Sequence, residues 1–392
     1  MSSIAYVDHQ GFLNVLDSIG EPSRRIDAPD IYCTWPSWSP DGRTISFSGY
    51  QSADGSENEL GIYFADLEGG DARLIYANDF ETAEIAPSTP HYSLWSPDGS
   101  KLAFVAQTSD GSLTLFLHGP DGEAPPKRIL SGGPLYCAWS PDSDSIFVHS
   151  FQEHYMIDLE NDFEMRQFPG SSTLYMAPSW NPQDGRAAIF LDAENNRQRL
   201  VILGLREPEV KVLLEMPGIG ACSWQPGGSS LALVRDMRGR SGFYDGLWLL
   251  EPTEGAENKI NEDPVLAFFW SPDGSRIAYV TTSETGQGSL RWAVHTVESG
   301  DVAYLVDFRP TQENLITFMY FDQYNQSHSP WSPDGSKLLF AGELGHQQTR
   351  APLSDGESNR VYVVSSEGGD AEEVASGFIA CWGAANLASI GD

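Results

Sequence analysis

Basic residues, and lysine above all, are scarce in this chain. Among 392 residues only 23 are Lys or Arg, and five of these are Lys, against 55 Asp or Glu, which leaves a formal net charge of −32 at pH 7. An electric field of this sign repels nucleic acid and anionic lipid, so we expect neither as a partner. No apolar run approaches the roughly 18 residues of a membrane-spanning helix, so we expect no membrane insertion.

Cysteine is also sparse, and its spacing excludes the common metal and redox motifs. The four cysteines, Cys33, Cys137, Cys222 and Cys381, form no Cys-x-x-Cys pair, which zinc-binding and thioredoxin-like motifs require. We therefore expect reduced, buried thiols that pack as small apolar residues. The first eight residues contain neither a basic region nor an apolar segment of the kind that directs export. These features favour a cytoplasmic protein.

Motifs for catalysis and cofactor binding are missing as well. The sequence has no Gly-x-Ser-x-Gly nucleophile elbow and no glycine-rich phosphate or dinucleotide loop. Its eight histidines form no His-x-x-x-His pair. We therefore predict no catalytic residue, no metal site and no cofactor.

A repeated Trp-Ser-Pro-Asp-Gly turn organises the chain. It recurs, with variations, at seven positions, which are Trp38, Trp95, Trp139, Trp180, Trp224, Trp270 and Trp331. Each copy is followed by a short run of alternating bulky residues, such as residues 101–105, which is typical of a β-strand. In the turn, Pro fixes φ, Asp caps the nearby backbone and Gly adopts a positive φ. We expect each Trp to end a strand and to pack between neighbouring sheets.

The spacing of the repeats predicts an all-β fold. Four short strands per roughly 40–50 residues are typical of a β-propeller blade. An eighth tryptophan, Trp382, lies near the C-terminus, and matching strands lie at the N-terminus in residues 3–8 and 12–17. We therefore predict one domain, residues 1–392, that forms an eight-bladed β-propeller of four-stranded antiparallel blades. The last blade is shared between residues 1–29 and 376–392, so that the C-terminal strand pairs with the N-terminal strands.

With these residues the chain resembles the TolB-type β-propellers, whose repeat is Trp-Ser-Pro-Asp-Gly followed by an Ile-Ala-Phe-like strand. The resemblance covers essentially the whole chain and implies the fold. Relatives of this type include the periplasmic TolB protein, which binds partners, the propellers of tricorn-like and prolyl-oligopeptidase-like peptidases, and some polysaccharide lyases. The family thus implies either a binding module or part of an enzyme, and the choice depends on the residues of the site.

Insertions in the repeat are predicted to lie on one face. In a propeller, the loops that lead into the innermost strands lie on the same rim as the loops that join second and third strands. The longest connections belong to these two classes, with 79–91 and 307–330 in the first and 49–60, 235–246 and 342–359 in the second. Because loops on a rigid scaffold commonly carry function, this face is the predicted binding face. Alternatively, both loop classes simply tolerate extra length.

Connection 307–330 is the most prominent of these, because long connections in compact repeats are often functional. Its candidate binding residues are Tyr320, Asp322, Gln323, Tyr324, Gln326 and His328. Three interpretations stay open: a recognition surface, a lid over the channel, and a connection that buries its own aromatic side chains.

Two further sets of residues are candidates for ligand contacts. Residues shortly before the repeat tryptophans are expected at the mouth of the central channel, and they are Asp30, Tyr32, His91, Tyr136 and Tyr175. Each is either a ligand contact or a satisfied residue of an inner strand. Three arginines lie within six positions, and they are Arg235, Arg238 and Arg240. They form either an anion clamp, because Arg binds carboxylates and phosphates with two parallel hydrogen bonds, or internal salt bridges.

Two classes of function follow from these observations. The favoured hypothesis is a non-catalytic binding or scaffold propeller that recognises a protein segment or a small anionic ligand on the loop-rich face, at the channel mouth. The alternative is a metal-assisted enzyme that acts on anionic saccharides. In its support, Gln323-x-x-Gln326-x-His328 resembles the Gln-x-x-His-x-His metal segment of oligogalacturonate lyases, with Gln326 in place of one ligand. An accessory propeller of a peptidase system is a further alternative.

Overall fold

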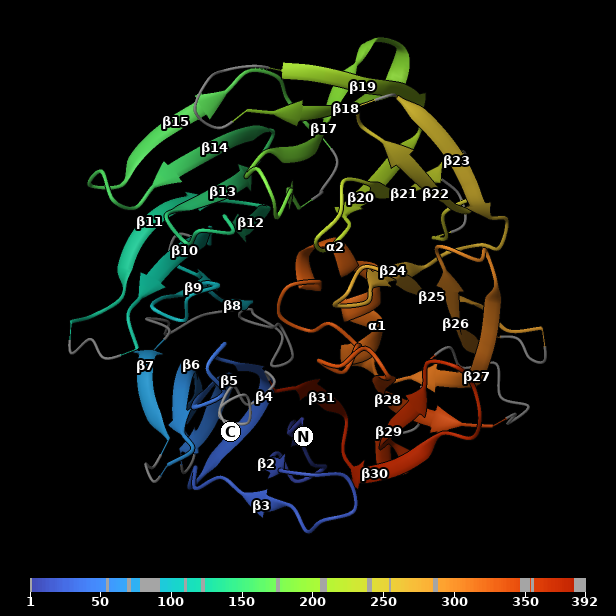
Figure 1. The fold of residues 1–392 in the computed structure, drawn as a ribbon. Coiled ribbons are helices and arrows are strands. Elements are labelled where there is room, and N and C mark those ends of the chain that lie inside the picture. Colours follow the sequence, from blue (N-terminus) through green and yellow to red (C-terminus); the bar gives the residue numbers. More distant parts are fainter. Residues whose placement is uncertain are drawn as a thin grey trace, which may run out of the picture. The chain divides into compact units, whose positions relative to one another are not determined.

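Antiparallel β-strands make up most of the structure, which is a computed structural model. It describes residues 2–53, 56–68, 72–77, 92–108, 111–120, 124–173, 177–204, 210–237, 242–253, 255–284, 288–345, 353 and 356–383. The strands form six four-stranded sheets and one sheet of seven strands (Figure 1). The chain divides into two compact units. Unit 1 comprises Met1–Ser131, Val306–Thr317 and Gln326–Asp392, and unit 2 comprises Gly132–Leu305 and Phe318–Asn325.

Unit 1 contains three of the four-stranded sheets, with strand orders β3-β2-β1-β31, β4-β5-β6-β7 and β11-β10-β9-β8. Its strands are β1 (Ile4–Val7), β2 (Leu13–Leu16), β3 (Arg24–Arg25), β4 (Ile31–Trp38), β5 (Thr44–Ala53), β6 (Ser56–Asp66), β7 (Arg73–Ala77), β8 (Ser93–Trp95), β9 (Leu102–Gln107), β10 (Leu113–His118), β11 (Lys127–Gly132), β28 (Lys337–Leu344), β29 (Arg360–Ser365), β30 (Glu372–Ser376) and β31 (Ile379–Trp382). A short 3-10 helix covers Gly356–Ser358.

Unit 2 contains the other three four-stranded sheets, each with its strands in sequence order. Its strands are β12 (Leu135–Trp139), β13 (Ser145–Ser150), β14 (Glu153–Asp158), β15 (Glu164–Phe168), β16 (Ser179–Trp180), β17 (Ala187–Ala193), β18 (Arg197–Leu203), β19 (Val210–Pro217), β20 (Ile219–Trp224), β21 (Leu231–Asp236), β22 (Leu247–Glu251), β23 (Ala256–Asn261), β24 (Ala267–Trp270), β25 (Arg276–Thr282) and β26 (Leu290–Thr296). A 3-10 helix covers Glu194–Asn196, and helix α2 covers Phe321–Tyr324. Strand β27 (Val302–Pro310) and helix α1 (Gln312–Met319) begin in one unit and end in the other.

The sheet count differs from the eight four-stranded blades that the repeats predict. Strand β27 continues to Pro310 and pairs with β28, where Phe308 lies opposite Leu344. This pairing joins two strand groups into the seven-stranded sheet β24 to β30. The strand expected before Trp331 is reduced to a single bridge between Trp331 and Leu338.

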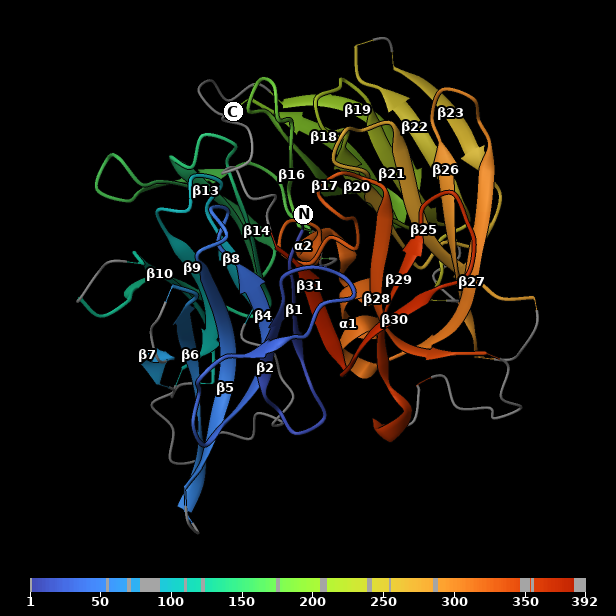
Figure 2. The same ribbon diagram turned by 60° about the horizontal axis from the view of Figure 1, so that its bottom comes forward.

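The two ends of the described chain share a sheet. Strand β31 pairs antiparallel with β1, with Ile4 opposite Trp382 and Val7 opposite Ile379. This is the pairing of C-terminal and N-terminal strands that the sequence predicted. Region 49–60, which was expected to be a loop, is mostly hairpin, because β5 runs to Ala53 and β6 starts at Ser56 (Figure 2).

The repeated turns share one hydrogen-bond pattern. The serine Oγ donates to the aspartate Oδ1 two residues later, at 2.5–2.6 Å. The same Oγ accepts from the backbone N–H five residues later, at 2.9–3.0 Å. These turns start at Ser39, Ser96, Ser140, Ser271 and Ser332. Four of them have a glycine at φ between 68° and 71°, as predicted, and the third has Ser143 at φ 66° instead.

The repeat tryptophans link neighbouring sheets, as predicted. In each of four cases the indole Nε1 donates to the carbonyl of the residue just before the preceding repeat tryptophan. The pairs are Trp95 to Ser37 at 3.2 Å, Trp180 to Ala138 at 3.2 Å, Trp270 to Ser223 at 3.1 Å, and Trp382 to Pro330 at 2.9 Å. The apolar clusters around Trp95, Trp180 and Trp224 combine side chains of two successive sheets. The core therefore lies between the sheets.

The four cysteines are buried and free, as predicted. Within the part of the chain that the structure describes, neither helix has the length and apolar character needed to cross a membrane.

Candidate functional site

Connection 307–330 contains two helices, α1 and α2, which the sequence analysis did not predict. Thr311 begins helix α1, because its side-chain Oγ1 accepts from the backbone N–H of Asn314 at 3.1 Å, which is N-cap geometry. Glu313 in the first turn interacts favourably with the helix dipole. The Asn314 side chain in turn accepts from the N–H of Ala341 in β28. The Thr-x-x-Asn pattern was the available signal for this helix start.

Most aromatic side chains of the connection are buried, as the third interpretation of this segment proposed. Phe318 is 1% exposed and its ring meets Trp292 edge-on at 5.4 Å. Phe321 is 2% exposed and packs on Phe268 at 4.9 Å. Tyr324 is buried as well. Two neighbours stay accessible at the junction of α1 and α2, since Met319 is 57% and Tyr320 is 40% exposed.

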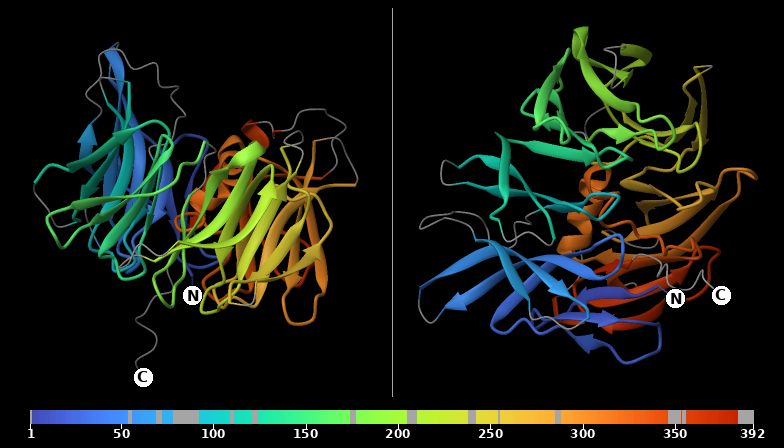
Figure 3. Two further views of the ribbon diagram at one scale, coloured as in Figure 1. Left: turned by 90° about the horizontal axis from the view of Figure 1, so that it is seen from above. Right: turned by 60° about the vertical axis from the view of Figure 1, so that its left-hand side comes forward.

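Helix α2 lies beside β12, β20 and β24 (Figures 1 and 3). Three polar side chains anchor α2 and the residue after it to separate strand groups of unit 2. Gln323 uses both amide atoms on Cys137 of β12, accepting from its N–H at 3.1 Å and donating to its carbonyl at 3.0 Å. The Asp322 carboxylate accepts from the N–H of Ala177 at 2.7 Å. Asn325 Nδ2 donates to Ser223 Oγ in β20 at 3.1 Å. These hydrogen bonds attach α2 and Asn325 to unit 2, to which both belong.

Asp322 has a perturbed acidity. Burial raises its pKa to about 6, and the backbone hydrogen bond from Ala177 partly opposes that rise. Burial raises the pKa values of Tyr244 and Cys222, and the negative charge of Asp322 raises both further. A carboxyl group that protonates near pH 6 is a site of pH-dependent stability.

The other predicted residues of this region lie in unit 1. His328 is buried, its Nδ1 lies 2.9 Å from Ser327 Oγ, and its ring meets Trp35 edge-on at 5.6 Å. Burial lowers the pKa of His328 to about 4, so the imidazole is neutral at pH 7. Gln326 is exposed.

Tyr32 of β4 is half-buried in an aromatic stack. Its ring lies 4.8 Å from that of Tyr50 and 6.1 Å from that of Phe378. Burial raises the pKa of Tyr32 to about 12, with a smaller contribution from Tyr50. The hydroxyl therefore stays protonated at neutral pH.

The remaining candidates are dispersed. Asp30 is exposed, with φ 60°, and Tyr136 is half-buried with its ring 6.2 Å from that of His149. Arg235 forms an ion pair with Glu257 and lies 4.9 Å above the ring of Trp248, which is the internal salt-bridge alternative. The other candidates, His91, Tyr175, Arg238 and Arg240, lie outside the described residues.

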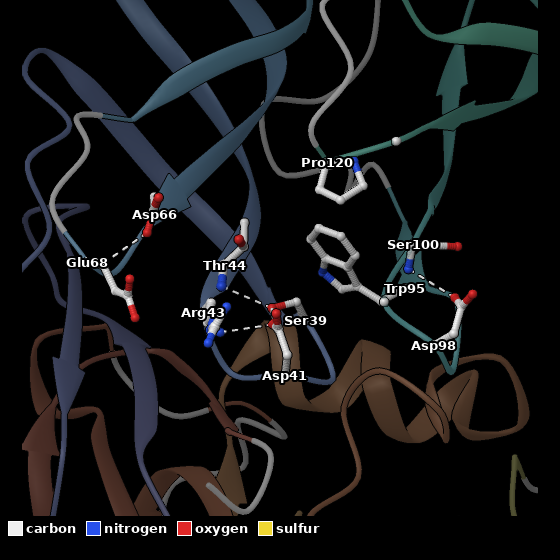
Figure 4. A pocket seen from close by; sticks show the side chains of 12 residues that line it. Ser39, Asp41, Arg43, Thr44, Asp66, Glu68, Trp95, Asp98, Ser100 and Pro120 are labelled. Carbon is white, nitrogen blue, oxygen red and sulfur yellow. Dashed lines mark hydrogen bonds between the residues drawn. The ribbon is translucent and has the colours of Figure 1, made fainter. Parts of the chain in front are cut away.

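A pocket in unit 1, which the sequence interpretation did not predict, lies between two successive repeat turns. Its volume is about 510 Å³ (Figure 4). Four carboxylates and one guanidinium line it, namely Asp41, Asp66, Glu68, Asp98 and Arg43. Figure 4 shows Trp95 between the turns, with Asp66 and Glu68 to one side and Asp98 to the other. The available signal was that two consecutive Trp-Ser-Pro-Asp-Gly turns occur in adjacent sheets.

The charge of this pocket is set by its lining. Asp41 and Asp98 each accept from the serine two residues earlier at 2.6 Å, and Asp66 accepts from the N–H of Glu68 at 2.9 Å. Burial alone would raise the pKa of Asp98, but its hydrogen bonds with Ser96 and Ser100 outweigh this and lower the pKa below its usual value. With four acidic groups against one basic group, the pocket disfavours an anionic occupant.

No protein-family model matches the chain. Among curated proteins, a stretch of 180 residues, 42% of this chain, is 23% identical to a subunit of eukaryotic translation initiation factor 3 from Arabidopsis thaliana. The match covers 24% of that protein, so the matched stretch spans about a quarter of its length.

Solved structures show which fold this is. The β-propeller domain of the trilobed protease from Pyrococcus furiosus is 12% identical, with a TM-score of 0.52 over 88% of this chain and 98% of that one. An oligogalacturonate lyase in complex with manganese is 19% identical, with a TM-score of 0.54 over 73% of this chain and 78% of that one. TolB from Acinetobacter baumannii is 17% identical, with a TM-score of 0.45 over 87% and 82%. Together with the four-stranded antiparallel sheets, the first two likenesses show that the chain is an all-β protein with the β-propeller fold.

Proposed function

We propose that this chain is a non-catalytic binding propeller that recognises a protein segment. The observation that carries the proposal is the pair Met319 and Tyr320, which is exposed at the junction of α1 and α2 while the flanking Phe318 and Phe321 are buried. The hydrogen bonds that Asp322 and Gln323 accept, and the one that Asn325 donates, anchor this junction on unit 2. Methionine and tyrosine are enriched in protein interfaces, and a pre-organised support lowers the entropy cost of binding.

Charge favours a basic segment over the small anionic ligand that was the other possibility. The net charge is −32, and the unit 1 pocket presents four carboxylates against Arg43. Such a field attracts lysine- and arginine-rich chains and accelerates their association at low salt. Arg235, the described member of the predicted anion clamp, is occupied by Glu257.

The enzymatic alternative is less well supported by the same residues. In a lyase-like site Gln323 and His328 would serve as metal ligands, but both amide atoms of Gln323 bond to Cys137 and the buried ring of His328 packs on Trp35. These side chains do not fit a metal centre, and we derive no reaction step from them. The likeness to a lyase and to a protease propeller concerns the fold.

The test uses synthetic 15-residue peptides of basic, neutral and acidic composition, each with two leucines, and measures their binding by fluorescence anisotropy. We expect basic peptides to bind best and to lose affinity as salt rises. The double variant Met319→Ser/Tyr320→Ser should weaken binding about tenfold or more, which corresponds to about 1.4 kcal/mol.

The matched control is Met165→Ser/Leu74→Ser, which changes two apolar side chains that are 42% and 46% exposed elsewhere. This control should bind like the unaltered protein. Equal weakening by both double variants, or a preference for acidic peptides, would contradict the proposal.

We also propose that the propeller has eight blades, that it is related to the TolB-type propellers, and that it is located in the cytoplasm. Eight blades are supported by the eight repeat tryptophans and by the two strand groups that share the seven-stranded sheet. A TolB-type relationship is supported by the Trp-Ser-Pro-Asp-Gly turns. A cytoplasmic location is supported by the four free cysteines, which suit a reducing compartment.

A further inference from the structure

Two buried histidines face each other across a hairpin of unit 2. His149 of β13 and His154 of β14 are directly opposed in the strand pair. Their rings stack at 4.6 Å with 29° between the planes. The side chains are 1% and 2% exposed. Two imidazoles that are this close and this deeply buried cannot both be positively charged without strong repulsion.

Ser172 ties this histidine pair to the next sheet. His149 Nε2 donates to the Ser172 carbonyl at 3.3 Å, and His154 Nε2 lies 3.4 Å from Ser172 Oγ. The same Oγ donates to the carbonyl of Phe190 in β17. If the Ser172 hydroxyl donates there, its oxygen accepts from His154, which places the proton of the neutral His154 imidazole on Nε2. The added proton would therefore go to Nδ1, and for His154 this atom is buried without a partner among the described residues.

The residues beside Ser172 extend this link. Thr173 N–H donates to Asp192 Oδ2 at 2.9 Å, and Asp192 N–H donates to the Ser171 carbonyl at 2.7 Å. Ser172 N–H donates to the carbonyl of Gln152 in the β13–β14 turn at 3.0 Å. Segment 171–173 thus connects the β13–β14 hairpin with β17, and the histidine pair is one of its attachments.

The elements packed against the pair carry several charged or titratable groups. They are Tyr136 on β12, whose ring lies 6.2 Å from that of His149, Glu153, Tyr155 and Asp158 on β14, Glu164 and Arg166 on β15, and Asp192 on β17. Glu153 accepts from the Tyr155 hydroxyl, Arg166 lies over the ring of Phe168 at 4.8 Å, and Asp192 accepts from Thr173. The charge of a protonated histidine would thus gain no carboxylate partner in the closed arrangement without breaking one of these contacts.

We propose that the His149–His154 pair is an acid-sensitive latch, in which protonation of one imidazole releases the hairpin from Ser172 and loosens segment 171–173. Ala177, shortly after this segment, donates to Asp322 beside α2. Acid would therefore also weaken the support of Met319 and Tyr320, and this consequence alone rests on the proposed function.

The direction of the effect follows from the acidity of His154. Burial, and to a smaller degree the charge of His149, lower its pKa from 6.5 to about 3 in the closed protein. A histidine whose pKa is lower when closed takes up a proton on opening, so closure is lost as the pH falls below 6.5. Relative to pH 7.5, we expect opening to be about tenfold more frequent at pH 5.5 and on the order of 100-fold more frequent at pH 4.5.

The experiment is hydrogen–deuterium exchange of the full chain without any partner, read by mass spectrometry on peptides that cover residues 149–173. Rates are measured from pH 7.5 to 4.5 and corrected for intrinsic exchange. The unaltered protein should show the increase given above. His154→Phe keeps an aromatic ring at this position but cannot be charged, so its exchange should change less than about threefold.

The control variant is His118→Phe, which removes another buried histidine, in unit 1, whose pKa is also lowered by burial. It should leave the pH response of peptides 149–173 intact. A flat response of the unaltered protein, or an unchanged response in His154→Phe, would overturn the latch. Should His154→Phe fail to fold, an NMR titration replaces it, and a His154 imidazole that titrates near pH 6.5 without faster exchange would equally refute it. Because no peptide ligand is used, failure here is separate from failure of the proposed function.

Discussion

The repeated turns and the connection from Thr311 to His328 satisfy their polar groups in opposite ways. In each Ser-Pro-Asp turn, the serine and the aspartate bond within a stretch of six residues, as Ser271 and Asp273 do. In the connection, Gln323 bonds to Cys137, which is 186 residues away in sequence. Local bonds make the turns uniform copies, whereas distant bonds make the connection a unique element that depends on the surrounding sheets.

The largest expected effect comes from breaking the two hydrogen bonds between Gln323 and Cys137. Gln323→Leu would leave the N–H and the carbonyl of Cys137 without partners in a buried site, where each unsatisfied group costs about 1–3 kcal/mol. We expect the free energy of unfolding, measured with urea, to fall by about 3 kcal/mol. Gln326→Leu, an exposed position in the same connection, should change it by less than about 0.5 kcal/mol. Similar losses in both variants would show that Gln323 is not an anchor.

A smaller effect is expected at Asp322, and it depends on pH. The pKa of Asp322 is raised to about 6 in the folded protein. Its contribution to stability is therefore fully present at pH values below the usual pKa of a carboxyl group, and it is lost as the pH rises through 6. Asp322→Asn keeps an acceptor for the Ala177 N–H and carries no charge.

The variant should therefore be more stable than the unaltered protein at pH 8, by about 2 kcal/mol, and nearly equal to it at pH 4. Thermal unfolding at both values measures this difference. A variant that is less stable at pH 8 would show that Asp322 is needed in its charged form.

The smallest effect concerns the turn that departs from the others. Ser143 has φ 66° where the equivalent turns have glycine, and a non-glycine residue in this region costs about 1–2 kcal/mol. Ser143→Gly should raise stability by about 0.5 kcal/mol after the entropy cost of glycine. The reverse change, Gly99→Ser at φ 71°, should lower it by about 1 kcal/mol, since the space around Gly99 accepts a Cβ. Urea midpoints of the two variants that shift in the same direction would contradict this account.

The same contrast explains what the sequence could predict. The strands after each turn, the positive φ of the turn glycines and the packing of Trp95 follow from residues that are close in sequence. The helical form of the connection was missed because the Thr311 cap is a weak signal beside a long segment rich in aromatics and amides.

Long-range partners were not accessible to the same reasoning. Phe321 packs on Phe268 and His328 packs on Trp35, and these partners are distant in the chain, so no spacing reveals their burial. The acidic pocket was missed for a similar reason, because it requires two turns 57 residues apart, at Trp38 and Trp95, to lie side by side.

The pairing of β1 with β31 has a consequence for the order of synthesis. Gly383 N–H donates to the Ser3 carbonyl at 2.7 Å, so a short peptide linker between these residues would join them. New termini opened in the exposed turn at residues 298–300 would then leave every observed strand pair intact. Such a circular permutant would emerge from the ribosome beginning with β27. Comparing its folding with that of the original polypeptide would separate the influence of translation order on folding from the influence of the strand pairing.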